Sequence, residues 1–167
     1  MYFIKINTIR AYCAHEKIKM EVKIMSIEAY SLATEGEKRL TANFKIKEFA
    51  CADGSNVIFL DTRLPVLLQK IRDHFGRKVT ITSGYRTVYY NNTVLPKKGV
   101  KTSKNSQHLY GMAADIQVEG VEPATVAAYA ETLLPNTGGI GTYPKKAGRT
   151  HGWVHIDVRK QKSRWAQ

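Results

Sequence analysis

Apolar and polar positions recur with two different periods along this chain. In DTRLPVLLQKIRDHFG the spacing is helical: Asp61 or Thr62 can cap the first turn, and Gly76 ends the segment. Its apolar positions are Leu64, Leu67, Leu68, Ile71 and Phe75. A second helix is predicted for PATVAAYAETLLP, which is bracketed by Pro123 and Pro135.

Alternation with a period of two predicts the strands. It is present in KVTITSGYR and WVHIDVR, and AADIQV and GGIGTY are predicted as two further short strands. KVTITSGYR and AADIQV are separated by YYNNTVLPKKGVKTSKNS, a basic stretch rich in turn formers that predicts a long loop. Helices and strands follow one another without a regular βαβ order, so we expect an α+β fold with a small, largely antiparallel sheet and flanking helices.

The segment WVHIDVR carries polar residues at every second position. Trp153, His155 and Asp157 fall on one face of such a strand, and aliphatic residues fall on the other. We therefore expect His155 to lie on an exposed face, beside an acid and an aromatic ring and away from the core.

The length and composition describe a folded protein with a strong positive charge. The 167 residues correspond to about one domain. The net charge of +12 favours a polyanionic partner, which could be nucleic acid, an anionic membrane surface or an acidic wall polymer. Cys13 and Cys51 form no CxxC motif, which predicts two free thiols in a reducing compartment.

Three segments are expected along the chain. Residues 1–42 form an N-terminal extension, 43–160 the main domain and 161–167 a short C-terminal tail. Met25 opens a stretch typical of a cytosolic N-terminus, so we hypothesise that translation starts there and that the preceding 24 residues are not native. No apolar run approaches the roughly 18 residues that span a bilayer, and no secretory signal is recognisable, so synthesis in the cytoplasm and no membrane association are expected.

Two of the five histidines are set aside as metal ligands. His15 begins HEKIK, in which a lysine stands where a zincin helix needs its second histidine. His74 ends the first predicted helix, a position that suits a surface histidine near the helix C-terminus.

His108 and Asp115 stand seven residues apart in SQHLYGMAAD. Asp115 belongs to an otherwise apolar strand, where a carboxylate is costly unless it is paired, hydrogen-bonded or bound to a cation. With His155 the pair makes two histidines and one carboxylate, a common catalytic zinc set that leaves a fourth position open. A satisfied polar pair would fit the same spacing.

SQHLYGMAAD resembles the SxHxxGxAxD signature of zinc D-alanyl-D-alanine carboxypeptidases and related phage endolysins, which share the hedgehog/DD-peptidase fold. The similarity continues through FKIKEFAC, the first helix, VTITSGYR, GGIGTY and WVHIDVR, over about residues 43–159. The signature positions in register are Ser106, His108, Gly111, Ala113 and Asp115.

The resemblance implies that His108, Asp115 and His155 bind zinc. It also implies that Arg86, from SGYR, holds a substrate carboxylate or polarises the scissile carbonyl, for which a guanidinium is suited. The alternative for Arg86 is a surface salt bridge. Ser106 is expected to order its loop.

The general base departs from the family pattern. Relatives carry an acid or a histidine two or three residues before the last ligand, where this chain has Trp153 and Gly152. The remaining candidates are His151, which could equally be a solvated loop residue, and Asp157, which could instead orient His155.

The function implied by the resemblance is zinc-dependent hydrolysis of peptide bonds in peptidoglycan stem peptides, as a D-Ala-D-Ala carboxypeptidase or an endolysin-type endopeptidase. Such an enzyme, expected to be a monomer, would reach the wall after phage lysis or recycle wall fragments in the cytoplasm, and anionic wall polymers could bind it. A non-catalytic wall-binding module of the same fold is the alternative. A nucleic-acid binder would explain the charge but not the histidines and aspartate, so no nucleic acid is expected.

Overall fold

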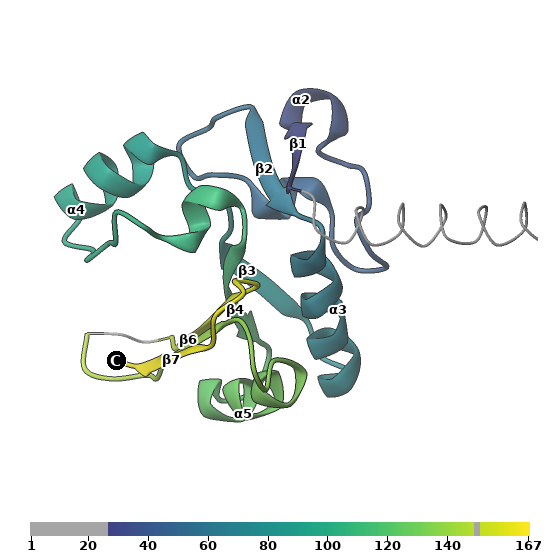
Figure 1. Cartoon of the computed structure of the whole chain (residues 1–167), viewed down its shortest axis with the longest axis vertical. Helices are drawn as coiled ribbons and strands as arrows, with labels where there is room; N and C mark the ends of the chain where they lie inside the picture. The colour runs from purple at the N-terminus through teal and green to yellow at the C-terminus, as the bar shows by residue number, and fades with distance from the viewer. Residues whose placement is uncertain (1–26, 149–150) are drawn as a thin grey trace, which may run out of the picture.

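The computed structural model describes residues 27–148 and 151–167 (Figure 1). The expectations for Cys13, His15 and a start at Met25 concern residues outside these ranges. The elements in chain order are β1 (Ile27–Ser31), α2 (Leu32–Glu35), η1 (Ile46–Phe49), β2 (Val57–Asp61), α3 (Arg63–Phe75), β3 (Val79–Ser83), η2 (Tyr90–Val94), α4 (Leu95–Lys97), η3 (Gln107–Tyr110), β4 (Ala113–Val118), α5 (Pro123–Leu133), β5 (Gly139–Tyr143), β6 (Trp153–Asp157) and β7 (Ser163–Ala166).

A five-stranded sheet in the order β3-β4-β6-β5-β7 forms the centre of the molecule. Neighbouring strands are antiparallel except β5 and β7, which are parallel. Helices α3 and α5 contact the sheet and share a hydrophobic core with it (Figure 1). The core includes Leu64, Leu68 and Ile71 from α3, and Ile116 and Ile156 from the sheet. The predicted α+β fold is confirmed.

The helix predicted from Asp61 or Thr62 to Gly76 forms as α3. Thr62 occupies the N-cap position, but its side chain makes no capping hydrogen bond. The Asp61 carboxylate instead accepts the backbone N–H of Arg63 at 3.0 Å and also pairs with its guanidinium. Gly76 ends the helix in the left-handed conformation, with φ of 59°, which glycine adopts without strain.

Both ends of the described chain pair with strands of the fold, although the predicted boundaries set residues 1–42 and 161–167 apart from the main domain. β1 pairs with β2 in a separate two-stranded sheet, and Tyr30 belongs to the hydrophobic core, although residues 27–42 fall in the expected N-terminal extension. β7, in the expected C-terminal tail, adds a parallel edge strand to the large sheet. Such long-range pairings leave little signal in short strands.

The stretch predicted as a long loop contains helical turns. η2 and α4 are consecutive, and each contributes one buried side chain, Asn91 from η2 and Leu95 from α4. Pro96 sits in the first turn of α4, where its missing N–H costs no hydrogen bond. In the part of the chain that the structure describes, no helix has the length and apolar character needed to cross a bilayer.

Candidate metal centre

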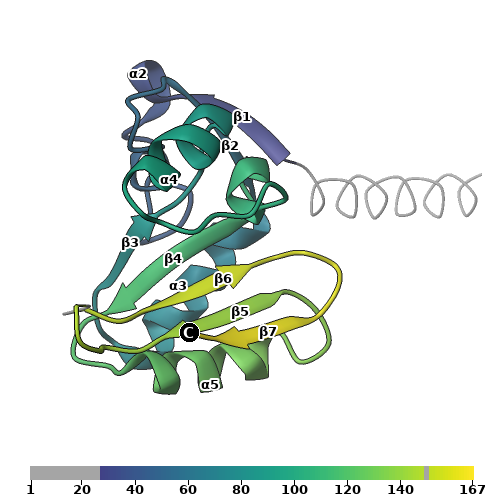
Figure 2. The same ribbon diagram turned by 90° about the vertical axis from the view of Figure 1, so that its left-hand side faces the viewer.

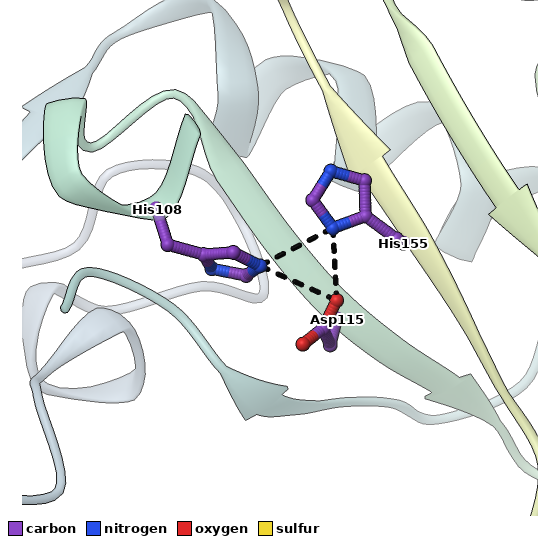
Figure 3. Close-up of side chains that lie close together, drawn as sticks. All are labelled: His108, Asp115 and His155. Carbon is purple, nitrogen blue, oxygen red and sulfur yellow. Dashed lines mark hydrogen bonds and ion pairs between the residues drawn. The ribbon is translucent and has the colours of Figure 1, made fainter. Parts of the chain in front are cut away.

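Three side chains from three elements converge on the sheet (Figure 3). His108 comes from η3, Asp115 from β4 and His155 from β6. Asp115 and His155 face each other because they are register partners in the antiparallel pair of β4 and β6. The structure thus brings together the three residues that the sequence predicts as a set.

A glycine allows η3 to deliver His108. η3 ends at Gly111, whose φ is 67°, and a side chain at this position would overlap the backbone of Phe59 in β2. Only glycine therefore lets the turn pack closely on the strand. The ring of His108 is then held by the carbonyl of Gly84, 2.7 Å from Nδ1. With Nδ1 as the donor, the lone pair of Nε2 points into the centre.

The ring of His155 is held from the opposite side. Its Nε2 lies 3.0 Å from Oδ2 of Asp157, which leaves Nδ1 directed at Oδ1 of Asp115, also at 3.0 Å. Asp157 is fully buried and accepts hydrogen bonds from the backbone of Gly139 and from the guanidinium of Arg159. This carboxylate therefore fixes the orientation of the His155 ring, as is common for histidines that bind metals.

The three inward atoms fit a small tetrahedral metal ion. His108 Nε2 lies 3.2 Å from His155 Nδ1 and 3.4 Å from Asp115 Oδ1, and the third edge of the triangle is 3.0 Å. Zinc with bonds of about 2.0–2.1 Å places tetrahedral ligand atoms about 3.3 Å apart. Two imidazoles and one carboxylate are also a donor set that zinc prefers. The residues present fit a zinc ion with one open position.

The electrostatics match this donor set. Burial lowers the pKa of His108, so the ring is neutral and able to donate a lone pair near pH 7. Burial opposes ionisation of Asp115, but the neighbouring histidines outweigh it and hold the pKa of this carboxyl well below its usual value. Burial also disfavours the charged form of His155, yet Asp115 and Asp157 together raise its pKa.

Arg86 lies at the edge of the centre and not on the open surface. Its guanidinium donates to Oδ2 of Asp115 at 2.7 Å and to Oγ of Ser83 at 2.8 Å. Because Oδ2 is taken by Arg86, Oδ1 is the oxygen of Asp115 that faces the histidines. A guanidinium carries five N–H donors, so further ones remain for another group at this edge.

The prediction that His155 lies on an exposed face is wrong. The face is correctly separated from the core, with Val154 and Ile156 on the other side, but His155 is only 7% exposed. The indole of Trp165, from β7, covers it at a ring distance of 5.1 Å. This covering depends on β7, which local periodicity did not reveal.

The two candidates for the general base lie in different places. Asp157 is behind the His155 ring, on the side away from Asp115, and is saturated by donors. His151 is exposed and lines a separate cavity of about 280 Å³ together with Glu122 and Lys145. His74, set aside as a ligand, is likewise elsewhere, stacked on Tyr129 at 3.6 Å.

Sequence reasoning missed two residues that hold the centre. Arg159 contacts Asp157 through its side chain and backbone, and Trp165 packs against His155. The spacing of Asp157 and Arg159 repeats that of Asp61 and Arg63, where the same carboxylate-guanidinium pair forms. This repeated Asp-x-Arg pattern was the available signal for Arg159.

The model of the peptidase M15 family matches residues 42–157. The peptidoglycan L,D-endopeptidase MepK of Escherichia coli K12 is 34% identical over 83 residues, which are 49% of this chain and 41% of the relative. The probable peptidoglycan L,D-endopeptidase MepK of Haemophilus influenzae is 31% identical over 100 residues, or 56% of this chain and 50% of the relative. The chain thus spans half or less of the length of these relatives. No solved structure matches.

Proposed function

The chain belongs to the peptidase M15 family, and we propose that it is a zinc-dependent endopeptidase that cleaves the peptide part of peptidoglycan. Both relatives described above carry the name peptidoglycan L,D-endopeptidase, which favours an endopeptidase over a D-Ala-D-Ala carboxypeptidase. The observation that carries the proposal is the triangle of His108, Asp115 and His155, whose edges of 3.0–3.4 Å suit tetrahedral zinc.

His108, Asp115 and His155 would hold the metal through Nε2, Oδ1 and Nδ1. A zinc ion there supplies Lewis acidity toward the scissile carbonyl and lowers the pKa of a water molecule. The outward nitrogens of the two rings stay on the Gly84 carbonyl and the Asp157 carboxylate, so neither imidazole can turn away from the centre.

Arg86 is proposed to bind the substrate oxygen that becomes negative during hydrolysis, or a substrate carboxylate. Its contacts with Asp115 and Ser83 support this role, because a guanidinium held there would lie next to a group bound at the centre. The same contact with Asp115 positions that ligand, so loss of Arg86 is expected to impair both metal binding and turnover.

The general base remains between two residues, and the contacts of Asp157 support an orienting role for it. Its carboxylate is fully buried and faces Nε2 of His155, whereas the ring nitrogen that would bind the metal is Nδ1. A base must reach the proton that it removes, within about 3 Å or through one water molecule. His151, the other candidate, is exposed in the bend just before β6 and lines a separate cavity, so its position does not support this role either.

The test is digestion of purified peptidoglycan, with mass spectrometry of the soluble products. Wild-type protein with zinc is expected to release peptide fragments, chelator to stop their release, and added zinc to restore it. His108→Ala should release none, whereas His74→Ala, which removes a histidine outside the centre, should behave like wild type.

Two results would contradict the proposal. Undiminished hydrolysis by metal-free protein or by His108→Ala would exclude the metal centre. Sedimentation with the wall but no soluble product, in the presence of zinc, would instead support a non-catalytic wall-binding module of the same fold.

A further inference from the structure

A strongly basic segment borders the candidate metal centre. We define the basic arm as residues 87–105, which begin next to Arg86 and end just before η3, the element that carries His108. The basic arm includes η2 and α4. In Figure 2, α4 lies above β4 and β6 on the side that faces the viewer, while α3 lies behind the sheet. Because Arg86 precedes it and η3 follows it, both ends of the basic arm adjoin the metal centre.

We propose that the basic arm binds a polyanionic polymer of the cell wall and holds the protein on its insoluble substrate. This inference rests on the proposed function, because it takes the wall as the place of action. The partner is defined by its chemistry: a chain of repeated phosphodiester or carboxylate groups, with which lysines interact as point charges.

The charge around the basic arm has one sign. Residues 74–114 contain seven lysines and arginines and no acid. Four of the lysines lie in the basic arm and all four are exposed: Lys97, Lys98, Lys101 and Lys104. None of these four forms an ion pair with a residue that the structure describes. Their charges are thus available to a partner.

The lysines are presented by a folded segment. Asn91 is completely buried and donates from Nδ2 to the carbonyl of Ser103, which joins the outgoing and returning parts of the basic arm. Leu95, the first residue of α4, is buried, and the hydroxyl of Thr87 donates to Asp53 at 2.5 Å. Binding by a preorganised segment loses less conformational entropy than binding by a disordered one.

The exposed apolar residues are too few for membrane insertion. Val88 and Tyr89 are exposed at the start of the basic arm, and Val100 is the single apolar residue among 97–104. A helix that lies in a bilayer interface needs a broad apolar face, which this segment lacks. A positively charged surface with only isolated apolar and aromatic side chains is better suited to binding a hydrated polymer than to entering a bilayer.

The test is cosedimentation of chelator-treated protein with purified cell walls over a series of salt concentrations. The arm variant replaces Lys97, Lys98, Lys101 and Lys104 by glutamine. The control variant removes the same number of charges at exposed lysines elsewhere: Lys70, Lys78, Lys146 and Lys160. We expect the arm variant to lose most wall binding. The slope of its log affinity against log salt concentration should become less negative by about 3, because each of the four lost contacts with a flexible polyanion contributes about 0.7 to the slope. The control variant should change far less.

Hydrolysis of a short soluble wall peptide separates docking from catalysis. Both variants, loaded with zinc, should retain wild-type kcat/KM on this peptide. Because sedimentation uses metal-free protein, wall binding can succeed or fail independently of the proposed peptidase activity. Treatment of the walls with hydrofluoric acid, which removes phosphodiester polymers, identifies the anionic group. Arm-dependent binding should disappear after this treatment if phosphodiesters are the ligand. It should persist if carboxylates of peptidoglycan are the ligand.

Three outcomes would overturn the inference. Equal losses of wall binding in the arm and control variants would mean that only net charge matters. Parallel loss of soluble-peptide hydrolysis in the arm variant would place the basic arm in the catalytic site instead. Tighter arm-dependent binding to double-stranded DNA or to anionic phospholipid vesicles than to walls, at the same salt, would assign another partner.

Discussion

Asp157 shows how one buried carboxylate can set the properties of a neighbouring histidine. It binds His155 through Nε2 and is itself held by Arg159. Asp157→Asn keeps the side-chain shape but removes the charge, so we expect zinc affinity to fall about 10–100-fold, as for other groups that orient metal ligands. A zinc-chelator competition assay measures this change.

Asp61→Asn is the matched control for Asp157→Asn. Asp61 is also buried and also pairs with an arginine two residues later, Arg63, but it has no contact with the metal centre. Both substitutions should lower the free energy of unfolding, because each leaves an arginine without its carboxylate. Only Asp157→Asn should weaken zinc binding, and equal zinc affinities for the two variants would refute the orienting role.

The protonation of His155 predicts that zinc binding releases a proton. Burial disfavours the charged form of His155, but Asp115 and Asp157, one at each ring nitrogen, raise its pKa in the metal-free protein. Zinc requires the lone pair of Nδ1, so the affinity should increase as the pH rises through this pKa. Calorimetry at pH 6.5 in buffers of different ionisation enthalpy should show a net release of protons on zinc binding, and no dependence on the buffer would contradict this.

At the scale of elements, β7 closes the centre by placing an indole against β5. Trp165 covers Gly141, the register partner of His155, and donates from Nε1 to the hydroxyl of Tyr143 at 2.8 Å. A side chain on Gly141 would overlap the indole, so Gly141→Ala is expected to destabilise the fold by about 1–3 kcal/mol, the usual cost of overpacking. Denaturant unfolding measures this cost.

A double-mutant cycle tests whether the indole is the cause. In a Trp165→Ala background, Gly141→Ala should cost less than about 0.5 kcal/mol, because the overlapping group is gone. Gly111→Ala should stay costly in either background, since its added methyl group would overlap the Phe59 backbone. An equal cost of Gly141→Ala in both backgrounds would contradict the packing of the Trp165 indole on Gly141.

At the scale of the whole molecule, the sheet separates two regions. The helices α3 and α5 share the hydrophobic core with the sheet, and His155 lies outside that core. In Figure 2, α3 lies behind the sheet, whereas α4 of the basic arm lies on the side that faces the viewer. β4 and β6 are neighbours within the sheet, so the ligands Asp115 and His155 come together only when the sheet has formed. Metal binding should therefore stabilise the entire domain.

Zinc at 100 times its Kd is expected to raise the free energy of unfolding by about 2.7 kcal/mol, because it binds the native state and not the unfolded chain. Thermal unfolding with and without zinc measures this as an increase in Tm. His108→Ala should show no increase, whereas His74→Ala should retain it. An equal increase in His108→Ala would place the stabilising ion elsewhere.

Local sequence pattern determined much of the fold and of the candidate site. The apolar period placed α3, α5 and the strands β3 to β6, because burial of one face imposes that period on any amphipathic element. It also marked Asp115 as a carboxylate on an apolar strand, and the signature SQHLYGMAAD added His108. As predicted from WVHIDVR, Val154 and Ile156 belong to the hydrophobic core and His155 and Asp157 do not, although both polar side chains are buried.

The tertiary structure alone decided how these residues are used. Which nitrogen of His108 and of His155 faces the centre depends on the Gly84 carbonyl and the Asp157 carboxylate, whose positions follow from turns and strand register. The burial of His155 depends on Trp165 in a parallel strand at the far end of the chain. Periodicity reports which face of an element is apolar, but contacts between elements distant in sequence are set only when the whole chain packs.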